Sequence, residues 1–263
     1  MSKCAAPRQR KRSSEDCKTP HGNAEWPSDY SLGKLAGKDC PQNFSELQDW
    51  LIQHAGPQEW RGKLYVAKSI EWNGNEFRQD GCGPNYQAGW WSLACCKHDM
   101  RGSTPFREIV DSGTPIFVFT LAQKCPIIGR QALVSIAKIS EYFQTMEEYA
   151  GYLLKTKDER LISSRFTGHR RNDGQLGWRF GDCHANLKGK KWKPVMGHVH
   201  REDEKDATWE DDCKGDHLIL LSKHADFLLW EKPTFVGKHT VRTKNIDDLV
   251  MLEDFLLPCR KYI

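Results

Sequence analysis

Apolar side chains recur at two different spacings along the chain, and each spacing predicts a different secondary-structure element. Over Ser45–His54 they fall three and four residues apart, which predicts a helix that stops at Gly56-Pro57. From position 63 they alternate with other residues, which predicts a strand. The apolar run Pro115–Ala122 predicts a buried strand, and Gln131–Ile139 predicts its neighbour in the sheet.

The second half of the chain predicts a capped helix and several short strands. Thr145 and Glu148 have the spacing of a capping box, so we expect a helix to begin there. The charged stretch Lys155–Gln175 predicts an exposed insertion. Short strands are predicted at 195–200, 218–221 and 227–230, before a closing helix over about 246–256. Together the elements predict a single α+β domain with a bent, mainly antiparallel sheet flanked by helices.

Residues 1–43 differ from the rest of the chain in composition. They mix Ser, Pro, Gly, Asn and charged residues with little apolar periodicity, which predicts a disordered or loosely attached arm. A helical lead-in at 44–62 follows, then the main body at 63–257 and a short tail at 258–263. Asn43-Phe44-Ser45 has the form of a glycosylation sequon, but we interpret it as the entry to the first helix.

The formal net charge of +4 at pH 7 comes entirely from residues 1–20, which contain six basic and two acidic side chains. The remaining 243 residues contain 33 side chains of each sign, so the body has no net charge. Broad, nonspecific binding to duplex nucleic acid needs a basic face, so the neutral body argues against it. The cluster Arg8-Gln9-Arg10-Lys11-Arg12 suits a nuclear address, a phosphate-binding tether or a solubilising tail.

Cysteine content and hydropathy bear on the compartment. Ten cysteines in 263 residues exceed ordinary usage but fall short of a disulfide scaffold, which favours a reducing compartment. The start of the chain does not show the apolar segment of a secretion signal. The apolar run at 115–122 is far shorter than the roughly 20 residues of a membrane span. We therefore expect an intracellular protein, nuclear or cytoplasmic, without membrane association.

Two neighbouring segments combine a carboxylate, an amide, two thiols and two cations. The segment Asp80–Asn85 is rich in Gly and Pro and predicts a loop whose backbone can approach a ligand. Further along, Cys95 and Cys96 precede Lys97, and Arg101 follows. A thiol beside a cation has a depressed pKa and can act as a nucleophile, for instance toward C6 of a pyrimidine. The two cations suit a phosphate.

The same residues also have a structural interpretation. Adjacent cysteines such as Cys95 and Cys96 can be inert small side chains in a core strand, and Lys97 and Arg101 can be solvated. If the run from 90 to 98 is extended, alternate residues face opposite sides and only one thiol faces a site. In the catalytic interpretation, Asp80 serves as a base or anchors a sugar hydroxyl.

Metal ligands are scattered rather than grouped. The chain contains no Cys-x-x-Cys pair, so we assign no metal site, and no cofactor follows from the sequence. In an extended segment His198 and His200 would point the same way and suit a metal or acid–base work, although two exposed histidines are the simpler interpretation. Gly181-Asp182 predicts a turn that presents a carboxylate.

Residues 63–257 resemble the second type of nucleotide modification associated domain. The likeness depends on the order of motifs rather than on any one of them. Two positions depart from the family pattern, because His98 replaces the usual Pro after the Lys, and Cys183-His184 follows the Gly-Asp turn. The motifs are Asp80-Gly81, Pro84-Asn85, the run Ser92–Lys97 with Arg101, Pro115–Leu121, Glu147-Glu148-Tyr149, Gly181-Asp182, and Asp216–Ser222 leading to Phe227.

The resemblance implies a protein that takes part in modifying a nucleotide or a DNA base, with DNA favoured over RNA and no protein partner indicated. It also implies a possible PUA-like barrel, since the turn and returning strands are similar to that group. The alternative is a reader that binds a modified base without chemistry, with Tyr86, Trp90 or Trp91 as a stacking wall. The expected catalytic residues are Asp80, Cys95 and Cys96, and the expected binding residues are Asn85, Tyr86, Trp90, Trp91, Lys97, Arg101, Asp182, His198 and His200.

Overall fold

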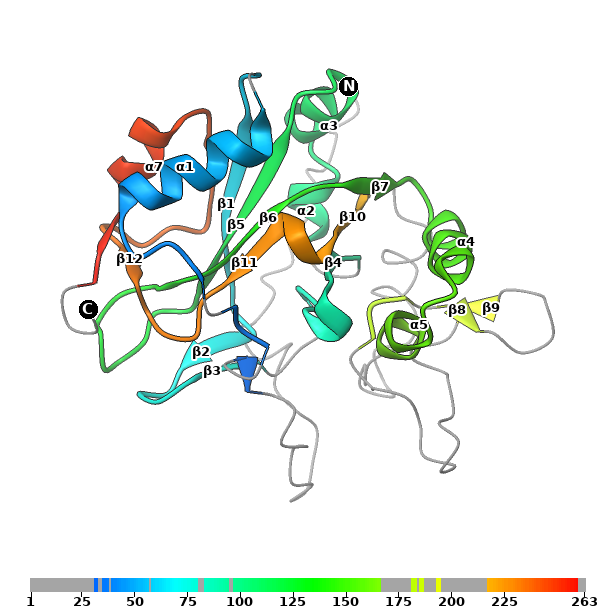
Figure 1. Cartoon of the computed structure of the whole chain (residues 1–263), viewed down its shortest axis with the longest axis horizontal. Coiled ribbons are helices and arrows are strands. Elements are labelled where there is room, and N and C mark those ends of the chain that lie inside the picture. The colour runs from blue at the N-terminus through cyan, green and yellow to red at the C-terminus, as the bar shows by residue number, and fades with distance from the viewer. Residues whose placement is uncertain are drawn as a thin grey trace, which may run out of the picture.

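A mixed five-stranded sheet lies at the centre of the molecule, in the order β11-β6-β5-β1-β13 (Figure 1). The computed structural model describes residues 31–32, 35–37, 39–56, 58–79, 83–94, 97–166, 181–183, 185–186, 193–194 and 217–259. Strands β1 and β5 are parallel, and the other neighbours in this sheet are antiparallel. The strands are β1 (Arg61–Ala67), β5 (Ile116–Ala122), β6 (Leu133–Lys138), β11 (Phe227–Leu229) and β13 (Thr243–Ile246).

Both faces of this sheet are covered, which explains why every residue of β5 is buried. One face packs against α1 (Phe44–Ala55) and α7 (Leu249–Phe255), through Leu47 and Leu51 on α1 and Leu252 on α7. The opposite face packs against the hairpin of β2 (Ile70–Trp72) and β3 (Phe77–Gln79) and against the second sheet. The sheet therefore separates two apolar cores.

The second sheet has three strands in the order β4-β10-β7, all antiparallel (Figure 1). Its outer side packs against α4 and α5 in a third apolar cluster. These elements are β4 (Trp91–Leu93), β7 (Glu141–Phe143), β10 (Ile219–Ser222), α4 (Met146–Thr156) and α5 (Glu159–Arg165). The remaining elements are η3 (Gln87–Gly89), α2 (His98–Arg101), α3 (Thr104–Asp111), β8 (Ala185–Asn186), β9 (Lys193–Pro194), η5 (His224–Asp226), β12 (Phe235–Gly237) and β14 (Leu256–Pro258).

The α+β class is confirmed, and several elements begin where their caps predict. Asn43 caps α1 by accepting a 3.0 Å hydrogen bond from the Glu46 amide. Thr145 and Glu148 form the expected capping box of α4. The strands predicted around 64, 115–122, 131–139, 218–221 and 227–230 are all present, and α7 begins three residues later than expected. In place of one bent sheet there are several, and none closes into a barrel within the described residues, so a PUA-like barrel is not confirmed.

The run from Trp90 to His98 is not extended over its whole length, so the condition on which only one thiol would face a site is not met. Strand β4 covers only 91–93, and Lys97 takes up a left-handed backbone with φ of 66°. The carbonyl of Lys97 then accepts hydrogen bonds from the amides of Met100 and Arg101, so α2 begins at His98. A residue in the left-handed region interrupts the extended backbone of a strand. Alternate side chains therefore do not keep pointing to the same face through this segment.

The exposed insertion predicted over Lys155–Gln175 is also wrong in the part that the structure describes. Helix α4 continues to Thr156, and Asp158 then caps α5 through hydrogen bonds from two backbone amides. Leu161 and Phe166 are fully buried. Residues 167–175 and the strand predicted at 195–200 lie outside the described residues.

Part of the predicted loose arm packs on the body. Leu32 is 2% exposed, and the thiol of Cys40 donates a 3.2 Å hydrogen bond to the carbonyl of Leu229. The indole nitrogen of Trp230 donates to the carbonyl of Pro41 at 2.9 Å. Within the described residues, contacts with the body are therefore present as early as Ser31, which pairs with Arg78. No helix in the described part of the chain has the length and apolar character to cross a membrane.

Gly62 in β1 is required by a close approach to Phe119 in β5. A Cβ atom at position 62 would lie 2.5 Å from Cε2 of Phe119 and 3.2 Å from the ring of Trp60. We expect Gly62→Ala to lower the free energy of unfolding by about 1–3 kcal/mol through overpacking. The loss should shrink in a Phe119→Leu background, as measured by urea unfolding followed by circular dichroism.

Gly151 in α4 provides the matched control for this prediction. A Cβ atom there would meet no atom within 4 Å. Gly151→Ala should therefore raise stability by up to about 1 kcal/mol, since Ala favours the helix. A destabilisation of similar size in both variants would contradict the close-approach explanation.

Candidate functional site

Asn85, the last residue of the predicted loop, and Ser92, which precedes the Cys-Cys-Lys segment in the sequence, form a short antiparallel pairing. The amide of Asn85 donates to the carbonyl of Ser92 at 2.8 Å, and the amide of Ser92 donates back at 2.9 Å. Residues 87–89 form the 3₁₀ turn η3 that connects the two sides. Gly89 is needed in this turn because its φ is 75° and a Cβ atom would lie 2.6 Å from the His224 ring.

The guanidinium of Arg165 holds this pairing from the side of α5. Its Nη1 donates to Oδ1 of Asn85 at 2.6 Å, and its Nη2 donates to the carbonyls of Trp90 at 2.9 Å and Gln87 at 3.2 Å. The side-chain amide of Asn85 donates in turn to the carbonyl of Ser164 at 3.1 Å. One side chain thus fixes three points on the segment from 85 to 92.

Asp182 is the carboxylate partner of this group. Its Oδ2 accepts a 2.6 Å hydrogen bond from the hydroxyl of Ser92, and its Oδ1 accepts one from Tyr149 at 3.2 Å. Nε of Arg165 lies 3.8 Å from Oδ1. Burial raises the pKa of Asp182, and the nearby guanidinium and the two hydroxyl donors oppose that rise. We call Asn85, Ser92, Tyr149, Arg165 and Asp182 the polar centre.

All five side chains of the polar centre are 0% exposed. A side chain with no exposed surface cannot contact a ligand that binds from solvent. The polar centre therefore acts by holding the backbone in place. Ion pairs and hydrogen bonds are stronger in such a dry environment than at the surface. The polar centre therefore positions the chain on both sides of the Asn85–Ser92 pairing.

The ends of both motif segments are fixed close to this pairing. The side-chain amide of Gln79 donates to the carbonyl of Pro84 at 2.7 Å, and Ser69 donates to the carbonyl of Gly83 at 3.1 Å. Asp80 directly follows Gln79, and Cys95 directly follows the buried residue Ala94.

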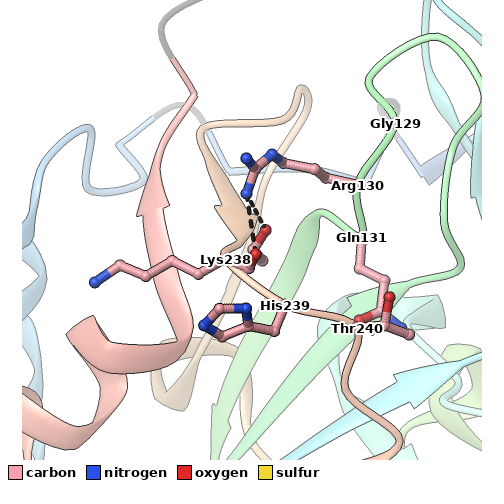
Figure 2. A pocket seen from close by; sticks show the side chains of 7 residues that line it. Gly129, Arg130, Gln131, Lys238, His239 and Thr240 are labelled. Atoms are coloured by element: carbon pink, nitrogen blue, oxygen red, sulfur yellow. Dashed lines mark hydrogen bonds between the residues drawn. The ribbon is translucent and has the colours of Figure 1, made fainter.

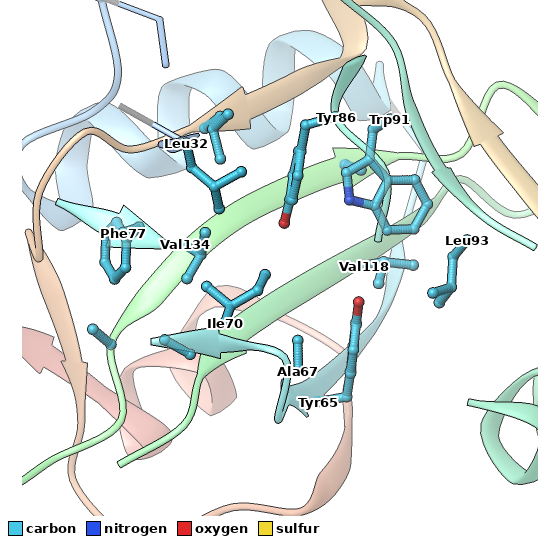
Figure 3. Packing of buried hydrophobic residues seen from close by; sticks show 14 of the residues in the cluster. Leu32, Tyr65, Ala67, Ile70, Phe77, Tyr86, Trp91, Leu93, Val118 and Val134 are labelled. Carbon is cyan, nitrogen blue, oxygen red and sulfur yellow. The ribbon is translucent and has the colours of Figure 1, made fainter. Parts of the chain in front are cut away.

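Lys97 lies on the side of β4 that is opposite the polar centre, beside a row of hydroxyl groups. Its ammonium is 5.6 Å from the centroid of the Tyr65 ring, within the range of a cation–π contact. Tyr65, Thr120 and Ser135 occupy directly paired positions on β1, β5 and β6. The hydroxyl of Tyr86 approaches this row, 2.8 Å from Ser135, and Figure 3 shows the rings of Tyr86 and Trp91 pointing into the same space.

The predicted binding residues fall into three groups. Asn85 and Asp182 meet through Arg165, and Trp90 contributes its carbonyl to the same guanidinium. Tyr86 and Trp91 are at most 1% exposed and belong to the apolar core, so neither presents a ring face at the surface. The other predicted site residues, Asp80, Cys95, Cys96, His198 and His200, lie outside the described residues.

Arg101 has a structural position rather than the exposed one expected of a phosphate ligand. Its side chain is 1% exposed, and Nη1 donates a 2.6 Å hydrogen bond to the carbonyl of Leu218, just before β10. The residue therefore ties α2 to the second sheet. A buried guanidinium engaged with a backbone carbonyl is a poor candidate for binding a phosphate from solvent.

Arg165 is the important residue that sequence reasoning missed, because the surrounding charges predicted an exposed stretch. A usable signal was present in Asp158, which has the residue type of a helix cap, followed by Leu161, Ile162 and Phe166 at helical spacing. Tyr149 was expected on the apolar face of its helix, and its hydroxyl contact with Asp182 was not foreseeable from that pattern.

No group of three or more potential metal ligands occurs among the described residues. The four described cysteines, Cys40, Cys125, Cys183 and Cys259, are buried. Burial raises the pKa of Cys40 to about 11, so that thiol is a poor nucleophile at neutral pH. Comparison of the chain with models of protein families, with curated proteins and with solved structures finds no match.

Removing the carboxylate of Asp182 should leave the buried guanidinium of Arg165 without its counter-charge. We expect Asp182→Ala to lower the free energy of unfolding by about 3–5 kcal/mol. The exposed pair of Lys223 with Glu141, 3.3 Å apart, provides the control. Lys223→Ala should cost less than about 1 kcal/mol in the same urea titration. Equal, small losses in both variants would show that the polar centre does not hold the fold.

The second site prediction concerns alkaline pH. Burial, reinforced by the charge of Asp182, raises the pKa of Tyr149 well above 10. The unfolded chain ionises this tyrosine from about pH 10 while the folded chain does not, so its contribution to stability falls as pH rises. Tyr149→Phe should cost about 1 kcal/mol at neutral pH by losing one hydrogen bond, and the gap should narrow above pH 10. Parallel pH profiles from urea unfolding would refute this.

Proposed function

We propose that the protein binds a nucleotide or a base of DNA and takes part in its modification, at a site built from the loop Asp80–Asn85 and the segment Cys95–Lys97. The observation that supports this most is the pairing of Asn85 with Ser92. It draws the flanks of both segments into one unit, and a buried ion pair holds that unit. This pairing supports the proposal because Asn85 and Ser92 flank the two segments in the sequence.

The residues in these segments suit attack on an electron-poor base. A thiolate at Cys95 or Cys96 is the proposed nucleophile, and the adjacent ammonium of Lys97 favours the ionised thiol. Asp80 is the proposed base. Lys97 is half-buried and lies over the Tyr65 ring, so its charge is close to the molecule and does not extend freely into solvent. The resemblance to the nucleotide modification associated family supports the same substrate class.

The alternative, a reader that stacks a modified base without chemistry, is less well supported. The rings of Tyr86 and Trp91 are buried in the core. Of the three aromatic residues proposed as a stacking wall, Trp90 alone is partly exposed. Stacking needs an accessible ring face, so a reader would depend on this residue.

The nucleoside content of DNA from cells that express the protein tests the proposal. Mass spectrometry should detect an altered nucleoside with the wild-type chain, and the double variant Cys95→Ser, Cys96→Ser should abolish it. Cys40→Ser is the matched control, because Cys40 is buried and a hydroxyl can keep the hydrogen bond to Leu229. This control should leave the altered nucleoside in place.

Two results would contradict the proposal in different ways. An altered nucleoside that persists in the double variant would exclude catalysis by these thiols. An unaltered profile with the wild-type chain, together with selective binding of a modified oligonucleotide that Trp90→Ala removes, would identify a reader instead.

A further inference from the structure

A small basic pocket opens at the end of the central sheet, between the turn from β5 to β6 and the loop that follows β12 (Figure 2). Its volume is about 230 Å³, below the range of pockets that hold drug-sized ligands. It is lined by Gly129, Arg130, Gln131, Gly237, Lys238, His239 and Thr240. None of these residues belongs to the polar centre or to the motif segments.

The ionisable side chains among the residues that line the pocket are all basic. Arg130, Lys238 and His239 contribute basic side chains, Thr240 contributes a hydroxyl, and no carboxylate lines the pocket. All four residues are exposed. Within the described part of the chain, no acidic side chain forms an ion pair with any of the three basic residues. The surrounding body is electrically neutral overall, so this local excess of positive charge is not an extension of a basic face.

The walls of the pocket are held in place by backbone hydrogen bonds. Nη1 of Arg130 donates to the carbonyls of Gly237 at 2.9 Å and Lys238 at 3.2 Å, as the dashed lines in Figure 2 show. The amide side chain of Gln131 bonds both the amide and the carbonyl of Val241, at 2.7 and 2.9 Å. The loop therefore begins and ends at fixed points.

Gly237 allows this loop to turn back closely. A Cβ atom at that position would lie 3.0 Å from the carbonyl oxygen of His239. Any other residue would push the loop outward and widen the gap to Arg130. Arg130 is thus a cation held in place by backbone carbonyls. Figure 2 shows the Lys238 side chain extended away from Arg130, so this exposed side chain has to turn toward an anion that binds at Arg130.

From these observations we infer that the pocket binds a phosphate group. A guanidinium and an ammonium donate several charge-assisted hydrogen bonds to phosphate oxygens, and the hydroxyl of Thr240 adds a neutral donor. The limited volume suits a single phosphate or the phosphate end of a larger ligand. This inference is independent of the proposed function, because it uses none of the residues on which that proposal depends.

Titration of the full chain with inorganic phosphate, followed by isothermal calorimetry, tests the inference. We expect saturable binding that becomes at least about tenfold weaker in the double variant Lys238→Met, His239→Gln, equivalent to about 1.4 kcal/mol. Both residues are exposed, so the variant should fold, and its circular dichroism should match the wild type. Lys232→Met, at another exposed lysine, is the control and should keep the wild-type affinity.

Competition then distinguishes the two sources of a phosphate group. Displacement of inorganic phosphate by a deoxynucleoside monophosphate identifies a phosphate monoester as the ligand. Displacement by a short oligonucleotide without terminal phosphates identifies a backbone diester. Absence of saturable binding to the wild-type chain, or an unchanged affinity in the double variant, overturns the inference. Neither result alters the nucleoside profile that tests the proposed function.

Discussion

A guanidinium withdrawn from water needs acceptors for its N–H groups, and this requirement organises the second half of the structure. Arg165 donates to the side chain of Asn85 and to two carbonyls of the adjoining turn, while the carboxylate of Asp182, 3.8 Å from Nε, supplies the counter-charge. These partners come from two parts of the sequence, both distant from Arg165 itself. The hairpin at 85–92, helix α5 and the turn at 181–183 are therefore placed relative to one another by one buried charge.

The sequence predicts the elements that depend on residues close together in the chain. It does not predict features that depend on contacts with residues far away in the sequence. The caps at Asn43 and Thr145 follow from short hydrogen-bonded patterns, and both are present. Strands β1, β5, β6 and β11 of the central sheet follow from their apolar patterns, whereas β13, which is exposed at three of its four residues, was not predicted. By contrast, the burial of Arg165 depends on a carboxylate 17 positions away, and the left-handed backbone at Lys97 has no residue-type signal. The pairing that joins the candidate site was likewise not visible in spacing alone.

The charge distribution gives the site its context. The positive excess of the chain falls in its first 20 residues, and the body is neutral. A neutral body lacks the broad positive field that attracts nucleic acid nonspecifically, so an anionic ligand would have to be bound by local groups. Arg101 is buried and donates to the carbonyl of Leu218, so its guanidinium is not an exposed group of this kind.

The parallel bridge between Phe166 and Cys183 has a consequence for how this protein can change over evolution. The amide of Cys183 donates to the carbonyl of Arg165 at 2.9 Å, so the chain leaves and returns at the same place. The entropic cost of closing a loop between these two residues rises slowly with loop length, by about 0.6 kcal/mol for each doubling. The polar centre includes residues at both ends of this interval, and we expect changes in the number of residues between them to have a small effect on the free energy of unfolding.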